Sequence, residues 1–340
     1  MILKNYAMAW LAAFFVAGQV AFQAQAAGLT TVITVISNAT SVEIQGALNR
    51  LPDSGGEVIL PAGNYQVLQP IVLQRDHEIL RGSGVATILH LADGTNCPVI
   101  ILGEPINDPE KIIHDLTVSD LFIDGNRFHQ QRELWRLHGE GSEIRNNGIT
   151  VQGVSNSIVE NVTCAHCRSG GLVTTRGVRG LTVRNFTSFD NEFDGLACYQ
   201  TESSVFTKLN LHDNPGAGIS LDLAFDNNVI SNATLNSNDL GIFMRSSSDN
   251  QFYNIMIHHS HHYGVFMAHA EMMTKRGWQP APRSECTHNS FTNLIAADCG
   301  SAGFRVNNTT CTNNILAGAQ FHNDVSGGLS MACADLVILQ

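Results

Sequence analysis

The chain has 340 residues, 44% of them hydrophobic and 14% charged, and its formal net charge at pH 7 is −11. This length is sufficient for one large hydrophobic core. The acidic balance argues against nucleic acid as a partner, because phosphate contacts need a basic surface, but local basic clusters could still bind an anionic sugar polymer.

The first 26 residues have the features of a secretory signal peptide. One positive residue, Lys4, precedes an apolar run from Ala7 to Val20, and Ala24-Gln25-Ala26 matches an A-x-A cleavage site. We therefore expect cleavage after Ala26, a net charge one unit more negative once Lys4 is removed, and a secreted or periplasmic location. The alternative is a signal anchor, but the apolar run is short, and we expect no membrane span elsewhere in the chain.

A short amphipathic helix is expected next. Thr40 and Glu43 match a capping box, and apolar residues follow at helical spacing as far as Leu51. We predict a helix over about residues 40–51 that ends before Pro52. Such a helix can cover the N-terminal end of a stack of strands, where edge groups would otherwise be unpaired.

The middle of the chain repeats itself. Six segments read glycine, apolar, any residue, apolar, and they begin at Gly148, Gly171, Gly195, Gly218, Gly241 and Gly264. The successive spacings are 23, 24, 23, 23 and 23 residues. A nearly constant period of this size indicates a solenoid, in which each repeat buries its apolar face against its neighbours. The alternation is typical of a β-strand with one face inside.

Asparagines recur with the same period. One series consists of Asn161, Asn185, Asn232, Asn254 and Asn293, and a second of Asn228, Asn250, Asn289 and Asn314. Asparagine tolerates a left-handed backbone, and stacked asparagines can hydrogen-bond from coil to coil. Three short strands per repeat, separated by Asn and Gly turns, predict an all-β fold: a single right-handed parallel β-helix. We expect the domain to span residues 27–340, with regular coils over about residues 118–318.

Two longer segments, residues 125–147 and about 269–288, interrupt the period. Binding residues often lie on loops of a rigid scaffold, and tryptophan beside arginine or lysine suits the ring face and the carboxylate of an acidic sugar. We assign to substrate binding the residues Arg127, Trp135, Arg136, Lys275, Arg276 and Trp278. The alternative is that both segments are ordinary solvated loops.

Two motifs upstream of the repeats carry a family resemblance. The stretch Gly55-Gly56-Glu57-Val58-Ile59-Leu60-Pro61-Ala62-Gly63-Asn64-Tyr65 is followed by Leu121-Phe122-Ile123-Asp124-Gly125-Asn126-Arg127. With the Asn/Gly coils, this order resembles the pectate-lyase-like superfamily of right-handed β-helices, and most of all the catalytic module of secreted mannuronan C5-epimerases. The resemblance covers about residues 41–318. It implies the β-helix fold but selects no reaction, because the superfamily includes lyases, hydrolases, epimerases, fructan transferases and phage tailspikes.

The outward face of the repeating strand carries a candidate site. Residues two and four after each glycine should point outward, and neighbouring strands are about 4.8 Å apart. The fourth positions of three successive repeats are Tyr199, Asp222 and Arg245, which should therefore stand in a row. We expect Phe243 and Phe266 beside this row, as binding residues.

His269 should lie just beyond the row and completes the candidate catalytic set. Abstraction of the C5 proton of a uronate needs a cation at the carboxylate, a base and an acid. Arg245 could neutralise the carboxylate, and Tyr199 or His269 could move the proton. Asp222 could hold Arg245 or position Tyr199. The alternative is a surface ladder in which an Asp–Arg pair only stabilises adjacent strands.

The reaction stays open. Epimerases carry an Asp-Pro-His-Glu motif after this glycine, where this chain has Ala197-Cys198-Tyr199-Gln200. A glycoside hydrolase needs two carboxylates about 5–10 Å apart, and Asp194 and Asp222 should be about 16 Å apart along the strand direction. We expect an exported carbohydrate-active enzyme that acts on a uronate-containing polysaccharide by lyase or C5-epimerase chemistry. The alternatives are a glycoside hydrolase and a non-catalytic glycan-binding protein.

Eight cysteines fit an oxidising compartment. Cys198 falls on an inward position, where we expect a buried free thiol. Cys286 and Cys311 each lie three residues before an asparagine of the second series, Asn289 and Asn314, so they should stack on adjacent coils and could be bridged. Cys333 is a rival partner.

We predict no metal site and no other cofactor. Cys164-Ala165-His166-Cys167 lacks a second cysteine pair at zinc-ligand spacing, so we expect a turn disulfide or two free thiols. The histidines between His258 and His262 crowd one turn without a carboxylate at ligand spacing, and we interpret this turn as solvated. Calcium, which pectate lyases hold with a cluster of aspartates, is left open because no such cluster is evident.

Overall fold

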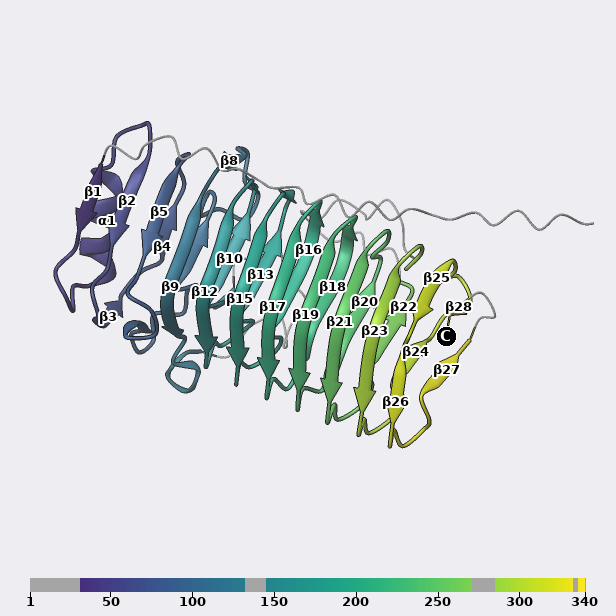
Figure 1. The fold of residues 1–340 in the computed structure, drawn as a ribbon. Coiled ribbons are helices and arrows are strands. Elements are labelled where there is room, and N and C mark those ends of the chain that lie inside the picture. Colours follow the sequence, from purple (N-terminus) through teal and green to yellow (C-terminus); the bar gives the residue numbers. More distant parts are fainter. Residues whose placement is uncertain (1–30, 132–144, 271–284, 333–335, 340) are drawn as a thin grey trace, which may run out of the picture.

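The computed structural model describes residues 31–131, 145–270, 285–332 and 336–339. These residues form an elongated parallel β-helix, in which successive coils stack from the N-terminal to the C-terminal end (Figure 1). The predicted all-β, right-handed β-helix fold is confirmed. The expected signal peptide lies outside the described residues, as do Trp135, Arg136, Lys275, Arg276, Trp278 and Cys333.

Two long parallel sheets run along the stack, and we call them sheet A and sheet B. The main path of sheet A consists of β1 (Val32–Thr34), β2 (Gly56–Ile59), β5 (Glu78–Arg81), β9 (Thr117–Asp124), β12 (Ile158–Ala165), β15 (Thr182–Phe189), β17 (Val205–His212), β19 (Val229–Asn236), β21 (Gln251–His258), β23 (Ser290–Ala297), β25 (Asn314–Ala317) and β28 (Leu336–Leu339). Paired to this path are β6 (Thr87–Leu91) and β26 (Gln320–His322), and β3 (Gly63–Val67) pairs with β6.

Sheet B carries the repeating glycine segments. Its main path consists of β4 (Ile71–Leu73), β7 (Ile100–Leu102), β10 (Ile149–Gln152), β13 (Leu172–Thr175), β16 (Leu196–Glu202), β18 (Ala217–Asp226), β20 (Leu240–Arg245), β22 (Val265–Ala268), β24 (Phe304–Val306) and β27 (Leu329–Met331). At its edge lie the short strands β8 (Ile113–His114), β11 (Val154–Ser155) and β14 (Val178–Arg179).

The predicted cap helix is present as α1 (Ser41–Asn49), so it is slightly shorter than the expected range of residues 40–51. The Glu43 carboxylate accepts a hydrogen bond from the Thr40 backbone N–H at 2.6 Å, as the capping box requires. Ile44 and Leu48 are fully buried against the first coils. The helix therefore lies at the N-terminal end of the stack, next to β1 and β2 (Figure 1).

The outer asparagine ladder bends the sheet A strands β12, β15, β19 and β21. Asn161, Asn185, Asn232 and Asn254 all have φ near +54°, and each stands in the middle of an eight-residue strand. The Asn185 amide donates to the Asn161 side-chain oxygen at 2.7 Å. Because the left-handed residue turns the chain without ending the strand pairing, the second and third strands expected per repeat form one bent strand.

The inner asparagine ladder is buried. Asn228, Asn250, Asn289 and Asn314 are each at most 1% exposed. Their side chains bond from coil to coil, with 3.0 Å between Asn250 Nδ2 and Asn289 Oδ1 and 3.1 Å between Asn289 Nδ2 and Asn314 Oδ1. Each amide also satisfies backbone groups of the turn, which would otherwise be buried without partners. The ladder thereby fixes the register of successive coils.

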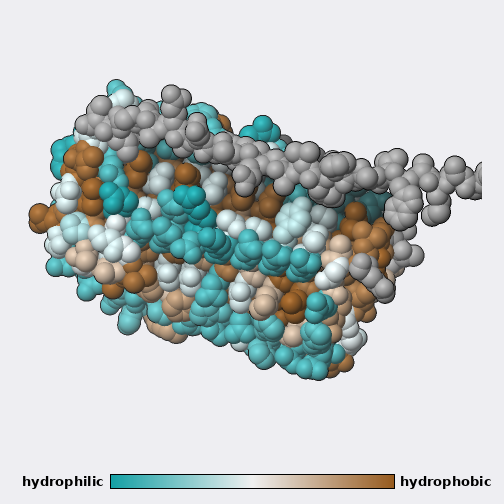
Figure 2. All heavy atoms as spheres, in the orientation of Figure 1, coloured by the Kyte–Doolittle hydropathy of each residue, from teal (hydrophilic) through white to brown (hydrophobic). Residues whose placement is uncertain are grey.

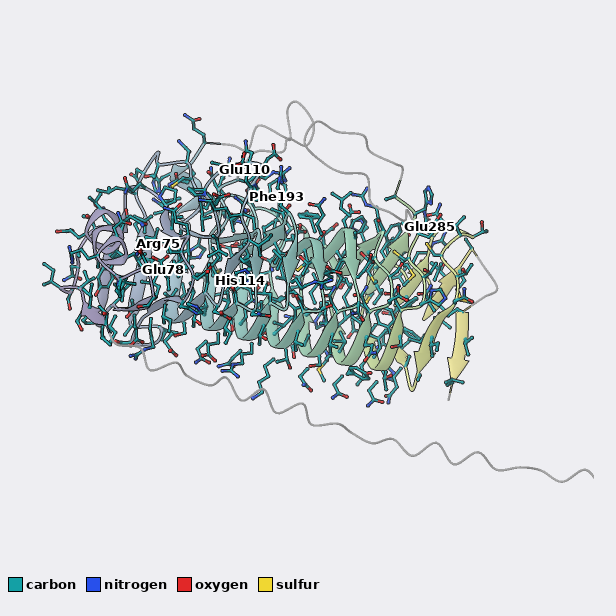
Figure 3. The ribbon with its side chains drawn as sticks, turned by 90° about the horizontal axis from the view of Figure 1, so that it is seen from above. Arg75, Glu78, Glu110, His114, Phe193 and Glu285 are labelled. Atoms are coloured by element: carbon teal, nitrogen blue, oxygen red, sulfur yellow. The ribbon has the colours of Figure 1, made fainter. Side chains whose placement is uncertain are left out.

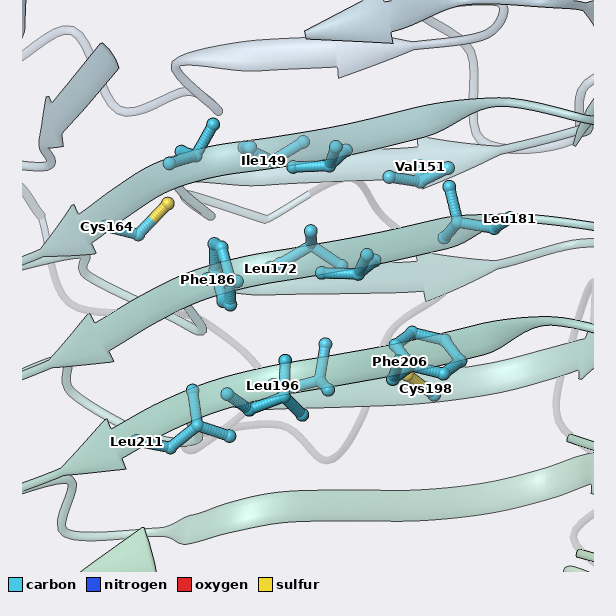
Figure 4. Packing of buried hydrophobic residues seen from close by; sticks show 14 of the residues in the cluster. Ile149, Val151, Cys164, Leu172, Leu181, Phe186, Leu196, Cys198, Phe206 and Leu211 are labelled. Carbon is cyan, nitrogen blue, oxygen red and sulfur yellow. The ribbon is translucent and has the colours of Figure 1, made fainter. Parts of the chain in front are cut away.

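Inward columns of apolar side chains form the core between the two sheets (Figure 4). Ile149, Leu172 and Leu196 follow one another in register and are fully buried. The face of Figure 2 is mostly hydrophilic, and hydrophobic residues gather toward the two ends of the stack. Within the described ranges, no helix is both long and apolar enough to cross a membrane.

Candidate functional site

A cavity of about 330 Å³ lies on the outer face of sheet B, over β10 to β20. Its aromatic and charged lining comes from successive coils and from the turns that precede them. These lining residues are Arg145, Arg176, Arg245, Asp194, Asp222, Asp239, Phe193, Tyr199 and Phe243. Phe193 lies near the middle of the stack, well away from Glu285 at its C-terminal part (Figure 3).

The structure brings together three of the residues singled out in the sequence. Tyr199 and Asp222 are register partners on β16 and β18. Arg245, on β20, forms an ion pair with Asp222 through Nη2 and Oδ2. The side chain of Asp222 is 5% exposed and that of Arg245 is 30% exposed. The row therefore presents a phenol and a guanidinium to the cavity, with the carboxylate buried between them.

The backbone after the row holds Asp222 in place. Leu223 and Ala224 have φ values of 52° and 68°, a left-handed conformation that is unfavourable for side chains of this kind. The Leu223 N–H donates to Asp222 Oδ1 at 2.8 Å. The second carboxylate oxygen pairs with Arg245, so Asp222 is fixed by both oxygens.

Aromatic rings support the guanidinium. Arg245 Cζ lies 5.0 Å from the centre of the Phe243 ring, a distance at which a cation and a ring face attract each other. Phe243 stacks in turn on Phe266, with ring centres 5.9 Å apart and planes 2° from parallel. Phe243 lines the cavity, and Phe266 lies one coil beyond it.

Two other predicted site residues are placed outside the cavity lining. Arg127, in the short 3-10 helix η1 (Arg127–His129), bonds the Asp190 carboxylate at 2.7 Å and the Asn191 carbonyl at 2.8 Å. It ties two turns together. The backbone N–H of His269 donates to Asn308 Oδ1 at 2.9 Å, beyond the end of β22.

The cavity also contains charged residues that the sequence reasoning missed as a group. Arg176 donates to Asp108 at 3.0 Å, and Asp194 accepts the Ala217 N–H at 2.7 Å. Asp239 pairs with His262 at 2.7 Å. The signal that could have found them is their position in the sequence. They lie just before or just after the repeating strand, in turns that stacking brings to one edge of sheet B.

Among the described residues, no cysteine or histidine lines this cavity. Cys198 is a fully buried free thiol beneath the row, as predicted, and burial raises its pKa to about 12. Cys286 and Cys311 are also free thiols, rather than the bridged pair that the spacing allowed. In the part of the chain that the structure describes, no three His, Cys, Asp or Glu side chains are grouped to hold a metal ion.

Comparisons with known structures show the same fold at low sequence identity. The A-module of a mannuronan C-5 epimerase from Azotobacter vinelandii is 14% identical, with a TM-score of 0.56 over 89% of this chain and 100% of that one. A family 28 exopolygalacturonase from Yersinia enterocolitica is 11% identical, with a TM-score of 0.58 over 91% and 78%. The tailspike of Escherichia coli bacteriophage HK620, in complex with a pentasaccharide, is 14% identical, with a TM-score of 0.60 over 86% and 56%. No curated protein sequence matches the chain.

A protein-family comparison matches residues 72–270, more than half of the 340-residue chain, to the family described as periplasmic copper-binding protein (NosD). Copper in its +1 state prefers thiolate and thioether ligands. The described residues include seven free cysteines. The sulfurs of Cys164 and Cys167 would each be 3.0 Å from a Cβ on Gly148, so soft donors do converge inside the fold. Such donors fit Cu(I). Because the match covers more than half of the chain, the chain belongs to the NosD family.

Proposed function

We propose that the cavity on sheet B binds a uronate-containing polysaccharide and that the Tyr199–Asp222–Arg245 row acts on it by lyase or C5-epimerase chemistry. The row itself is the observation that carries the proposal, because it sets a phenol and a guanidinium two coils apart in one cavity, with the Asp222 carboxylate between them. Phe243 and Phe193 offer ring faces, which suit the apolar faces of sugars.

Lyases and C5-epimerases share their first step, removal of the proton at C5 of the uronate. Negative charge then develops on the neighbouring carboxylate, and a fixed cation stabilises it. Arg245 is suited to this role because Asp222 and the Phe243 ring hold its guanidinium in place. Asp222 is a positioning residue, since both of its oxygens are engaged.

Tyr199 is the group that moves the proton in this proposal. It lines the cavity and is the register partner of Asp222, which places it two coils before Arg245. A phenolate takes the C5 proton. In a lyase the C4–O bond then breaks, a C4=C5 double bond forms, and the phenol protonates the leaving oxygen. In an epimerase a water molecule on the opposite face donates a proton to C5, and Tyr199 releases the proton that it took to solvent.

Three similar structures support a carbohydrate ligand. They are named as a mannuronan epimerase, an exopolygalacturonase and a tailspike with a pentasaccharide. The family description and the Ala24-Gln25-Ala26 motif support export to the periplasm. The negative net charge of the chain does not exclude an anionic ligand, because Arg145 and Arg176 also line the cavity.

A panel of acidic and neutral polysaccharides, with and without calcium, tests the proposal. Growth of the ultraviolet absorbance of unsaturated uronate establishes a lyase, and a change of C5 configuration in proton NMR spectra establishes an epimerase. New reducing ends without that absorbance mean hydrolysis. They would shift the assignment to Asp194 and Asp239, which flank Gly216 in the cavity. Binding without any product would make the protein a glycan-binding β-helix.

A further inference from the structure

The outer face of sheet B continues beyond the cavity as one column of side chains. Phe243 on β20, Phe266 on β22, Arg305 on β24 and Ser330 on β27 are successive register partners. Phe243 lines the cavity, whereas Phe266 and Arg305 lie outside its lining. The column therefore leads from the cavity toward the C-terminal end of the stack.

Among the described residues, Arg305 has only neutral hydrogen-bond partners. Its guanidinium donates to Ser330 Oγ at 2.5 Å and to Asn307 Oδ1 at 3.3 Å, and its Nε is buried without a partner. Arg179 and Arg245, the other arginines on the strands of sheet B, each pair with a carboxylate. A partly exposed guanidinium without a counter-ion is suited to bind a carboxylate of a ligand.

Two stacked aromatic rings separate the guanidinium groups of Arg245 and Arg305. Arg245 lies against the Phe243 ring, which stacks on Phe266, and Arg305 follows on the next coil. Tyr263 packs beside Phe266, with ring centres 5.2 Å apart. Phe243 and Phe266 are partly exposed, so they form an apolar strip on which the C–H groups of a sugar can pack.

The spacing of these two guanidinium groups suits an extended sugar polymer. Strands β20 and β24 are two strand spacings apart, about 10 Å. The Arg245 side chain leans back to Asp222 on β18, and the Arg305 side chain leans forward to Ser330 on β27. The two charges are therefore about three strand spacings apart, roughly 15 Å. Each unit of an extended 1,4-linked uronate chain advances by a length close to one strand spacing, so the end carboxylates of a tetrasaccharide match this separation.

We propose that Phe266 and Arg305 extend the cavity into a second carboxylate-binding subsite, so that the polysaccharide lies along the stack with one uronate at Arg245 and another at Arg305. The inference rests on the proposed function, because it takes the ligand to be the same uronate-containing polymer. Arg305 then determines specificity: it favours chains that carry a second uronate over chains in which that unit is neutral. No covalent bond changes at this subsite.

A purely structural role is the alternative, in which Arg305 only links β24 to β27 through Ser330. The two roles respond in opposite ways to a carboxylate at position 330. Ser330→Asp supplies Arg305 with a counter-ion, so it strengthens a structural link but competes with a ligand carboxylate. Ser330→Asn, which is uncharged and of similar size to Ser330→Asp, is the matched control.

Titration calorimetry with oligomannuronates and oligogalacturonates of two and four units tests the proposal. The full-length chain is used with Tyr199→Phe as the common background, which prevents turnover in the proposed mechanism. For the sugar that binds, we expect the tetramer to bind at least about tenfold more tightly than the dimer, since hydrogen bonds to charged groups contribute about that much. Arg305→Gln should remove this gain and leave the affinity for the dimer unchanged.

Three controls accompany this variant. Ser330→Asp should remove the gain as well, whereas Ser330→Asn should keep it. Arg179→Gln should also keep it, because this arginine lies on the edge strand β14 and pairs with Glu202. Neutral cellotetraose should bind with the same affinity whether residue 305 is arginine or glutamine.

Circular dichroism and a thermal melt verify the folding of each variant. Arg305→Gln and Ser330→Asp remove the free charge by different routes, so either one that folds is sufficient for the test. A tetramer that binds no more tightly than the dimer, or a gain that survives these two variants, would overturn the subsite and leave the proposed function standing. If oligouronates of neither length bind, the subsite and the proposed function both fail.

Discussion

The Asp222 carboxylate is almost completely buried, and its charge is balanced by Arg245 on the next coil. Removing the guanidinium leaves a buried carboxylate without its counter-ion. We therefore expect Arg245→Met to lower the free energy of unfolding by about 3 kcal/mol, as measured by urea denaturation at neutral pH.

The matched control is the double variant Asp222→Asn/Arg245→Met, which removes both charges. It should recover most of the lost stability, because an uncharged amide costs less to bury than an unpaired carboxylate. If the stability losses of Asp222→Asn and Arg245→Met simply add in the double variant, the ion pair does not stabilise this part of the row.

Tyr199→Phe separates chemistry from binding. The change removes one hydroxyl from the cavity and leaves the ring, the Asp222–Arg245 pair and the strand register in place. We expect kcat to fall about 100-fold or more with little change in glycan affinity, because general acid–base catalysis contributes about that much. Turnover on the active polysaccharide and calorimetric binding are the two measurements. Unchanged kcat would remove Tyr199 from the mechanism.

The sequence was sufficient to predict the fold because the same glycine segment, with alternating apolar positions, recurs about every 23 residues. Inward apolar positions and outward polar positions follow directly from the glycine segments, so the register of Tyr199 with Asp222 could be counted. The bent sheet A strands were not foreseen. A left-handed asparagine such as Asn161 turns the backbone without breaking the pairing, and sequence patterns do not distinguish that from a turn between strands.

The remainder of the cavity was harder to predict. Asp194 and Asp239 stand at different offsets before their glycines, and only the path of each turn brings them to one edge. Arg127 and His269 were assigned from their neighbourhood in the sequence, but neither is in the lining of the cavity, and the Arg127 guanidinium bonds a turn instead. Long-range placement of turn residues depends on backbone geometry that periodicity does not encode.

The inner asparagine ladder should contribute more to stability than the outer one. Asn250 accepts from the Asn228 backbone N–H at 2.9 Å and donates to the Phe225 carbonyl at 2.8 Å, all within the core. Asn250→Ala leaves these groups buried without partners, so we expect a loss of about 3 kcal/mol in urea unfolding.

Asn254→Gly on the outer ladder is the comparison for that variant. It keeps the left-handed backbone and removes only exposed bonds to Asn232 and Asn293. Its effect should stay within about 1 kcal/mol. Equal losses in the two variants would mean that burial of the ladder does not decide its contribution.

Acid should weaken the protein through Asp124. Burial alone raises the pKa of this carboxyl, but the Asn126 N–H and the imidazoles of His90 and His166 outweigh burial and leave the pKa below its ordinary value. The stabilisation is therefore complete above the unfolded-state pKa of about 3.9 and is lost as the pH falls through the lower folded-state pKa.

Asp124→Asn tests this linkage. The variant should be less stable than the wild type at pH 6, and the difference should shrink as the pH is lowered below about 4. Urea midpoints measured from pH 6 to pH 2 give the comparison. A difference that stays constant over this range would show that the charge of Asp124 contributes nothing to stability.

Each sheet B strand pairs with the strands directly before and after it, and this has a consequence for how such a protein can evolve. Duplication of one whole coil N-terminal to β16 would lengthen the molecule by one strand spacing, about 4.8 Å, and leave Tyr199, Asp222 and Arg245 as neighbours. The same duplication between β18 and β20 would part Asp222 from Arg245. The row thus depends on three consecutive coils, and whole coils can be added outside these three without changing it.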